Sequence, residues 1–194
     1  MLRVDWENYV QRRVRGILFL DYVRMIRGQK NVDWSRHLST DDHTFLEQQV
    51  EADAWYPMET FERFGIAIGR ELAKGQLDAV RMWGRFQIHS VFGIHPTLIA
   101  SGDPRETLLR FQVLRKSFFD YDALEVTELG DTRATVAVAY QMSPEAEEQA
   151  SHQTMGFIEG LLEAAGATSI HAQFRTKSWT GAPRTLIDYH WRRP

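Results

Sequence analysis

The chain has 194 residues, of which 43% are hydrophobic and 25% charged, and its net charge is −3 at pH 7. These values are typical of a globular protein with one or two domains, and the net negative charge does not favour phosphate-driven binding of nucleic acids. The absence of cysteine excludes disulfides, thiolate metal sites and cysteine nucleophiles. The longest apolar run, residues 16–26, contains Asp21 and Arg24 and is far shorter than the ~20 residues of a membrane span. We therefore expect a cytoplasmic protein.

The first half of the chain has the apolar periodicity of α-helices. Helices are expected over residues 4–26, 41–50 and 77–94, and from the Asp103-Pro104 start signal onward. Polar caps at Ser39, Thr40 or Asp41 and at Asp103 support two of these starts.

Residues 53–61, with the sequence DAWYPMETF, precede a further helical stretch. Pro57 suits the first turn of a helix, where its missing N–H is not needed. We interpret Trp55 and Tyr56 as rings that fold back over the apolar stripe of this helix, with Phe61 as a contact. On that interpretation Trp55→Ala should cost about 3–5 kcal/mol. The alternative is that the rings line a ligand pocket.

The period changes from 3.6 to 2 near Phe119. Two alternating segments flank Gly130-Asp131, which predicts a tight hairpin. A long helix should follow from Ser143 to Gly166, and then two strands joined by TGAP. The predicted fold is α+β, with an N-terminal helical layer packed on a C-terminal antiparallel ββαββ sheet unit.

The expected organisation is an N-terminal extension at residues 1–13 followed by a single α+β domain at 14–194. The helical part of this domain covers residues 14–119 and the ββαββ part covers residues 120–194. Trp6, Tyr9 and Val10 form an apolar stripe on the extension, which needs either the core of the same chain or another subunit to cover it. We predict a homodimer.

The order of several short motifs resembles haem-NO-binding domains and the related 4-vinyl-reductase-type domains. These motifs are the Tyr56-Pro57 pair, the ββαββ order, and the run Gly16, Tyr22-Val23, Gly28 and Trp34. From about Val14 onward the chain also resembles a large paralogous family of myxobacterial proteins that share the Trp-Tyr-Pro segment. The resemblance implies a fold and a ligand-sensing or interaction role.

The resemblance also implies what haem binding would require. Haem-NO-binding domains carry Tyr-x-Ser-x-Arg at the end of the strand before the long helix, and a proximal histidine earlier in the chain, here at residues 110–112. Tyr140 matches the tyrosine, but Met142 and Pro144 replace the serine and the arginine, and residues 110–112 contain no histidine. Because an axial histidine commonly holds haem iron, we expect no cofactor and keep a haem-based gas sensor as the alternative.

Motifs for metal binding and catalysis are absent from the sequence. None of the seven histidines has ligand spacing, so no metal is expected; His171 and His190 could be cross-strand neighbours, either solvated or weakly metal-binding. The acidic pairs Asp41-Asp42 and Glu147-Glu148 are interpreted as solvated helix surface. A non-enzymatic protein is the prediction, and an enzyme with an unrecognised carboxylate–histidine site is a further alternative.

Aromatic residues are abundant, with 6 Trp, 6 Tyr and 11 Phe. Many should build the core, and the surplus could line an apolar pocket. The candidate ligand-binding residues are Trp55, Tyr56, Phe61, Phe64, Trp83, Tyr140, Phe157 and Trp179. We therefore predict a sensor or adaptor in signalling or regulation that binds an apolar small molecule or lipid, or a protein partner.

Overall fold

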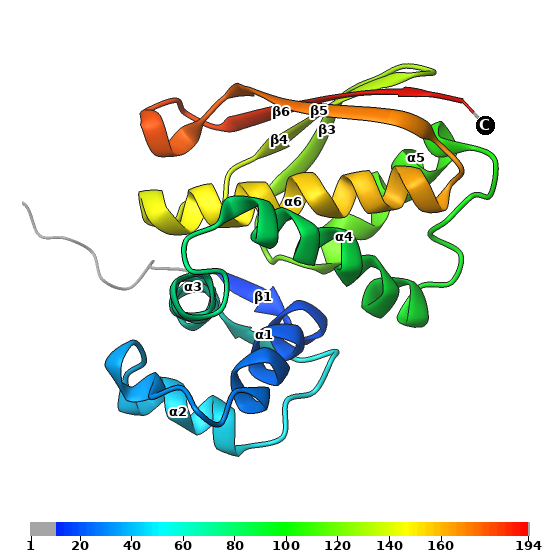
Figure 1. Ribbon diagram of the computed structural model, residues 1–194. Helices are drawn as coiled ribbons and strands as arrows, with labels where there is room; N and C mark the ends of the chain where they lie inside the picture. The colour runs from blue at the N-terminus through cyan, green and yellow to red at the C-terminus, as the bar shows by residue number, and fades with distance from the viewer. Residues whose placement is uncertain (1–10, 194) are drawn as a thin grey trace, which may run out of the picture.

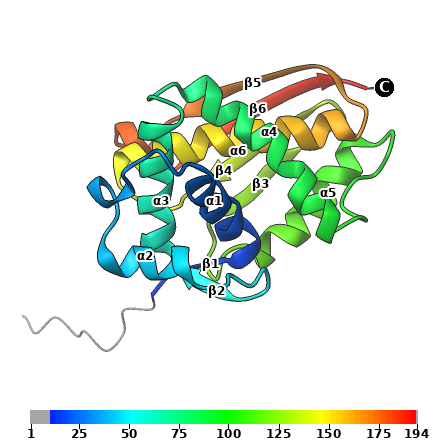
Figure 2. The same cartoon turned by 60° about the horizontal axis from the view of Figure 1, so that its bottom comes forward.

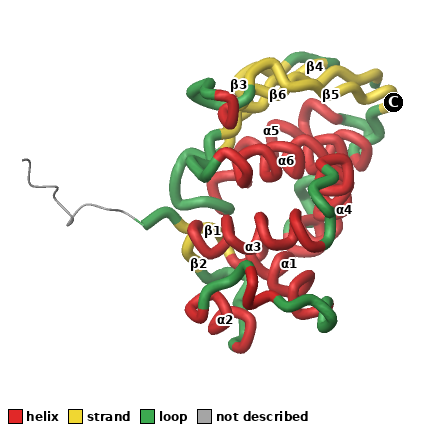
Figure 3. The backbone as a smooth tube through the Cα atoms, turned by 60° about the vertical axis from the view of Figure 1, so that its left-hand side comes forward, coloured by secondary structure: helices red, strands yellow, loops and turns green. Residues whose placement is uncertain are grey.

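The computed structural model describes residues 11–193. Trp6, Tyr9 and Val10, on which the apolar stripe of the extension was predicted, lie outside the described residues. A four-stranded sheet forms one outer layer, and a long helix, α6 (Pro144–Ala164), lies beneath it (Figure 1). Most helices of the N-terminal half pack on the other side of α6, and α2 (Thr40–Glu47) lies farthest from the sheet (Figure 3). Helix α5 (Pro104–Leu114) instead lies beside α6 and also contacts the sheet.

The N-terminal half is mostly helical, as the apolar periodicity predicts. Its elements are β1 (Arg13–Arg15), α1 (Gly16–Gly28), α2 (Thr40–Glu47), β2 (Trp55–Pro57), α3 (Met58–Glu71), α4 (Leu77–Ile94) and α5 (Pro104–Leu114). Single 3-10 turns occur at η2 (Trp34–Arg36) and η3 (Arg115–Ser117). The side chains of Ser39 and Asp103 cap α2 and α5 by accepting backbone N–H groups, as predicted.

The helix predicted over residues 4–26 is wrong at residues 13–15, which form the strand β1. This strand pairs antiparallel with β2, and Val14 lies opposite Tyr56. The N–H of Arg15 also donates to the carbonyl oxygen of Phe118 at 2.7 Å. Backbone partners far away in the sequence therefore override the local helical period, and α1 begins only at Gly16.

The C-terminal half is the predicted ββαββ unit. Its elements are β3 (Leu124–Leu129), β4 (Arg133–Val138), α6 (Pro144–Ala164), β5 (Thr168–Thr176), η4 (Ser178–Thr180) and β6 (Thr185–Arg192). The strands are antiparallel in the order β3-β4-β6-β5. The buried inner face carries Val136, Ile187 and Tyr189 against α6, whereas the ribbon shows no helix over the outer face (Figure 1).

Helices α4 and α6 lie side by side (Figure 2) and touch through glycines. A Cβ atom on Gly84 would lie well under 3.0 Å from the carbonyl oxygen of Gln153, and one on Gly156 would meet the carbonyl oxygen of Arg81 as closely. Gly160 faces the backbone of Arg85 in the same way. The two backbones are therefore in direct contact, which no larger residue permits.

The described part of the chain has no helix that is both long enough and apolar enough to cross a membrane.

The backbone contact between α4 and α6 gives a first prediction. Gly156→Ala should force α4 and α6 apart and lower the free energy of unfolding by about 1–3 kcal/mol or more, the cost of overpacking a dense interior. Gly93, also on α4, is the control, because an added Cβ there meets nothing within 4 Å. Gly93→Ala should stabilise the helix by up to ~1 kcal/mol. Urea unfolding of both variants measures the difference, and equal stabilities would contradict the contact.

Candidate functional site

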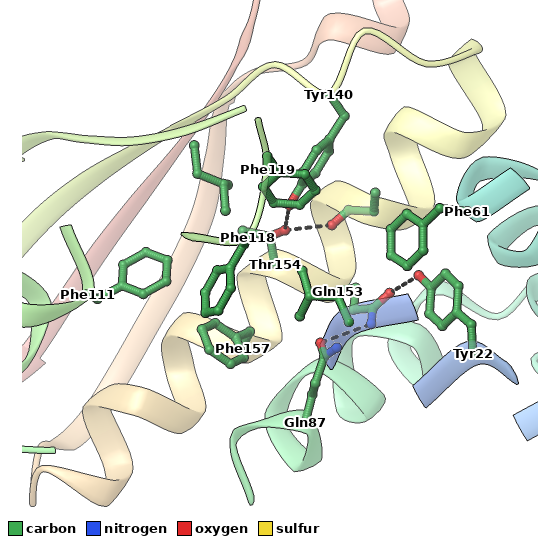
Figure 4. A pocket seen from close by; sticks show the side chains of 13 residues that line it. Tyr22, Phe61, Gln87, Phe111, Phe118, Phe119, Tyr140, Gln153, Thr154 and Phe157 are labelled. Atoms are coloured by element: carbon green, nitrogen blue, oxygen red, sulfur yellow. Dashed lines mark hydrogen bonds between the residues drawn. The ribbon is translucent and has the colours of Figure 1, made fainter. Parts of the chain in front are cut away.

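A cavity of about 50 Å³ lies between α1, α5, α6 and the ends of β3 and β4. Aromatic and aliphatic side chains make up most of its wall (Figure 4). The residues that line it are Leu18, Tyr22, Phe61, Gln87, Phe111, Phe118, Phe119, Leu124, Tyr140, Ala150, Gln153, Thr154 and Phe157. The described residues thus place an apolar cavity at the junction of the helical part and the ββαββ unit.

The aromatic walls come from both halves of the chain. Phe61 of α3 stacks on Tyr22 of α1, with ring centroids 4.5 Å apart. On the opposite side the ring of Phe111 lies 5.7 Å from that of Phe157. These aromatic pairs give the cavity a rigid apolar wall.

The polar groups of the cavity bond to one another. The hydroxyl of Tyr22 donates to Oε1 of Gln153 at 2.5 Å, and Nε2 of Gln153 donates to Oε1 of Gln87 at 3.1 Å. The hydroxyls of Tyr140 and Thr154 lie 2.6 Å apart (Figure 4). Burial raises the pKa of the Tyr22 and Tyr140 phenols far above its ordinary value, so both stay neutral.

Helix α6 positions a third of this wall through its periodicity. Ala150, Gln153, Thr154 and Phe157 are spaced i, i+3, i+4 and i+7, which places them on one helix face. The sequence predicts this helix between Ser143 and Gly166 and marks Phe157 as a candidate site residue, but it does not mark Gln153 or Phe111 as cavity residues. The spacing on α6 was the available signal, whereas the approach of Phe111 depends on tertiary packing.

The predicted site residues fall into three groups. Phe61, Tyr140 and Phe157 line the cavity. Tyr56 and Phe64 are buried away from it, and both rings pack against Phe19. The others lie elsewhere and are partly buried: Trp55 on β2, Trp83 on α4 and Trp179 on η4. The structure therefore brings three of the eight together.

The predicted role of Trp55 in the core is corrected by the structure. Residues 55–57 form the strand β2, and Pro57 is the residue before the first turn of α3. Alternation along the strand turns Tyr56 inward, where it stacks on Phe19 at 4.6 Å. Trp55 is only partly buried, and the guanidinium groups of Arg13 and Arg15 lie over its ring at 5.6 and 4.7 Å.

The interpretation of the acidic pairs as solvated surface is wrong for one residue of each. Asp42 is fully buried, and its carboxylate accepts two hydrogen bonds from Arg63 Nε and one from Nη2. Glu147 is 5% exposed. The ion pair with Arg63 accompanies the burial of Asp42, and tertiary packing buries Glu147. Helical periodicity predicts neither of these contacts.

His171 and His190 are cross-strand neighbours on β5 and β6, and both are exposed. Among residues 11–193 no group of three or more His, Cys, Asp or Glu side chains could hold a metal ion.

Comparison of the sequence with protein-family models and with curated proteins gives no match. Solved structures do match. An H-NOX protein from S. oneidensis in the Fe(II)NO state is 13% identical, with a TM-score of 0.61 over 92% of this chain and 99% of that chain. An H-NOX structure from T. tengcongensis is 11% identical, with a TM-score of 0.59 over 93% and 98%. An oxygen-binding H-NOX domain related to soluble guanylate cyclases is 10% identical, with a TM-score of 0.61 over 93% and 96%. The fold of this chain is thus the H-NOX fold, as the resemblance implied.

The cavity residues do not fit the ligation of haem iron. The cavity reaches from Phe111 to Tyr140, the two places at which the resemblance expects the proximal histidine and the tyrosine of the Tyr-x-Ser-x-Arg motif. Haem iron is held by imidazole, thiolate, thioether or phenolate donors. The lining contains no histidine, cysteine or methionine, and its two phenols are hydrogen-bonded and held neutral by burial.

The geometry of residues 55–57 gives a second prediction. Tyr56→Ala should lower the free energy of unfolding by about 3–5 kcal/mol, the range for a large buried aromatic. Trp55→Ala should cost only about 1–2 kcal/mol, because it loses two partly exposed cation–π contacts of roughly 0.5–1 kcal/mol each. Thermal and urea unfolding of the two variants measure this order, which would be reversed if Trp55 were the core residue.

Proposed function

We propose that this domain is a sensor that binds a small apolar molecule, without haem, in the cavity between α1, α5 and α6. The observation that carries the proposal is the lining of the cavity. Its walls are aromatic, and the polar groups described above already bond to one another. Such a site favours an apolar ligand, and it disfavours a charged ligand because its polar groups are already hydrogen-bonded to one another.

The size of the cavity limits the ligand. Sites for drug-sized molecules occupy ≈300–1,000 Å³, and this cavity has about 50 Å³. It suits a molecule of a few heavy atoms, and a lipid chain would require the rings of Phe111 and Phe157 to move. The further alternative of a carboxylate–histidine enzyme finds no support here, because neither residue type lines the cavity.

A ligand in this cavity would touch both halves of the domain. It would contact Tyr22 on α1 and Phe157 on α6, and Gln153 links α1 to α4 through its two hydrogen bonds. Displacing Phe157 would press on the residues beside Gly156, where α4 and α6 touch. Ligand binding would thereby be transmitted to helix positions at the surface.

The second candidate function is a haem-based gas sensor, and the similarity to H-NOX structures in Fe(II)NO and oxygen-bound states favours it. Titration of the purified protein with haemin separates the two candidates. We expect no saturable Soret band of ligated haem, because the cavity lacks an axial donor. An H-NOX protein treated identically is the positive control. A one-to-one haem complex would overturn the haem-free proposal.

Xenon tests the apolar cavity directly, because dry apolar cavities of proteins bind it. The wild-type protein should bind xenon in NMR titrations, with shifts of cavity residues. Ala150→Leu should abolish these shifts by filling the cavity, since Ala150 lies in its wall. Ala164→Leu, at an exposed position of the same helix, should bind xenon normally. Equal binding by the two variants would contradict this site.

We further propose that the chain pairs with a second copy. All six exposed large hydrophobic residues of the described part lie on α4 and α5, namely Met82, Phe86, Phe92, Ile94, Leu109 and Val113. Exposed apolar surface of this kind is typical of protein contacts. Light scattering should show a dimer for the wild type and a monomer for Phe86→Asp. A wild-type monomer at micromolar concentration would contradict the pairing.

A further inference from the structure

A second cavity, of about 180 Å³, lies between the β4–α6 connection and the turn between β5 and β6. It is separate from the aromatic cavity and shares no lining residue with it. The residues that line it are Ala139, Gln141, Met142, Pro144, Glu147, Ser178, Trp179 and Pro183. Among these, Glu147 is the one with an ionisable side chain.

Glu147 places a carboxylate without a counter-ion in the wall of this cavity. The residue is 5% exposed. Its Oε1 accepts the N–H of Met142 at 3.0 Å, and its Oε2 accepts the hydroxyl of Ser178 at 3.3 Å. Within residues 11–193 it forms no ion pair with a Lys, Arg or His nitrogen. Each carboxylate oxygen keeps acceptor capacity, and burial of such a charge is unfavourable until a cation joins it.

The backbone beside this carboxylate is held in an unusual conformation. Gln141 has φ +58°, which is in the left-handed region of backbone conformation that residues other than Gly and Asn rarely adopt. Nη1 of Arg12 donates to the carbonyl oxygens of Tyr140 and Gln141, both at 2.6 Å. Backbone strain that the surroundings maintain is concentrated at binding sites, and here it lies in the cavity wall.

Trp179 provides an aromatic wall for a cation. The indole is partly buried on η4, and the ammonium group of Lys177 lies 5.7 Å from its centroid and 5.7 Å from that of Phe174. This arrangement already attracts one ammonium group. Lys177 itself is exposed. Burial, and to a smaller extent the negative charge of Glu62, raises the pKa of the Glu147 carboxyl, and Oε1 of Glu62 accepts the N–H of Ser143 at 2.9 Å.

From the cavity, its buried unpaired carboxylate and its indole wall, we propose that this pocket binds a small alkylammonium ion. The ammonium group donates hydrogen bonds to Glu147, and its alkyl part lies against Trp179 and Met142. A neutral molecule of the same shape leaves the carboxylate uncompensated and binds more weakly. The proposal does not depend on what the aromatic cavity binds.

The test uses n-butylammonium as the probe and n-butanol as its neutral analogue, with the indole N–H signal of Trp179 followed by NMR. The signal should shift saturably with the cation only. Glu147→Gln should weaken this binding by about ten- to a hundredfold, the equivalent of a hydrogen bond to a charged group. Glu148→Gln is the matched control, because this neighbour does not line the pocket, and it should bind as the wild type does.

A measurement on the wild-type protein keeps the proposal testable if Glu147→Gln does not fold. The carboxyl signal of Glu147 should report a pKa that n-butylammonium lowers and n-butanol does not, because the cation stabilises the ionised form. Three results would each overturn the proposal. They are equal binding of n-butylammonium and n-butanol, unchanged binding of n-butylammonium by Glu147→Gln, and a Glu147 pKa that stays the same when n-butylammonium is added.

Discussion

The direct backbone contact between α4 and α6 is the constraint on which the other layers depend. Gly84, Gly156 and Gly160 remove the side chains that would separate the two helices. The close approach also brings Arg81 onto the buried carboxylate of Glu159, with Nε and Oε2 2.8 Å apart. Because the opposite face of α6 packs on the sheet (Figure 1), one helix contact fixes the distance between the helical layer and the sheet.

The same contact determines the shape of the aromatic cavity. A Cβ atom on Gly84 would meet the carbonyl oxygen of Gln153 and the backbone nitrogen of Phe157, two residues of the cavity wall. The amide of Gln153 reaches Gln87 on α4 at 3.1 Å only because the helices touch. A change in the crossing of the two helices would therefore change the cavity, and by reciprocity a ligand bound in the cavity would bias the crossing.

Local sequence patterns predicted the helices and strands that hydrophobic periodicity alone specifies. The helix over residues 77–94 has the bounds observed for α4, and the ββαββ order follows from the change of period near Phe119. The failures concern long-range partners. Residues 13–15 form a strand because β2 lies beside them, and Asp42 is buried because Arg63 reaches it from α3. Of the residues that line the cavity, the sequence marked Phe61, Tyr140 and Phe157. It did not mark Phe111, because this ring joins Phe157 only through tertiary packing.

Fold and site are specified by different residues, which is how an H-NOX fold can contain a cavity whose lining does not fit the ligation of haem iron. The glycines of the α4–α6 contact and the apolar stripes determine the architecture, and none of them is an iron ligand. The chemistry of the cavity depends on a few side chains, above all Phe111, which is fully buried at the place where the resemblance expects a histidine. A phenyl ring there packs on Phe157 and needs no hydrogen-bond partner. Similarity of fold therefore leaves the choice of ligand to the cavity wall.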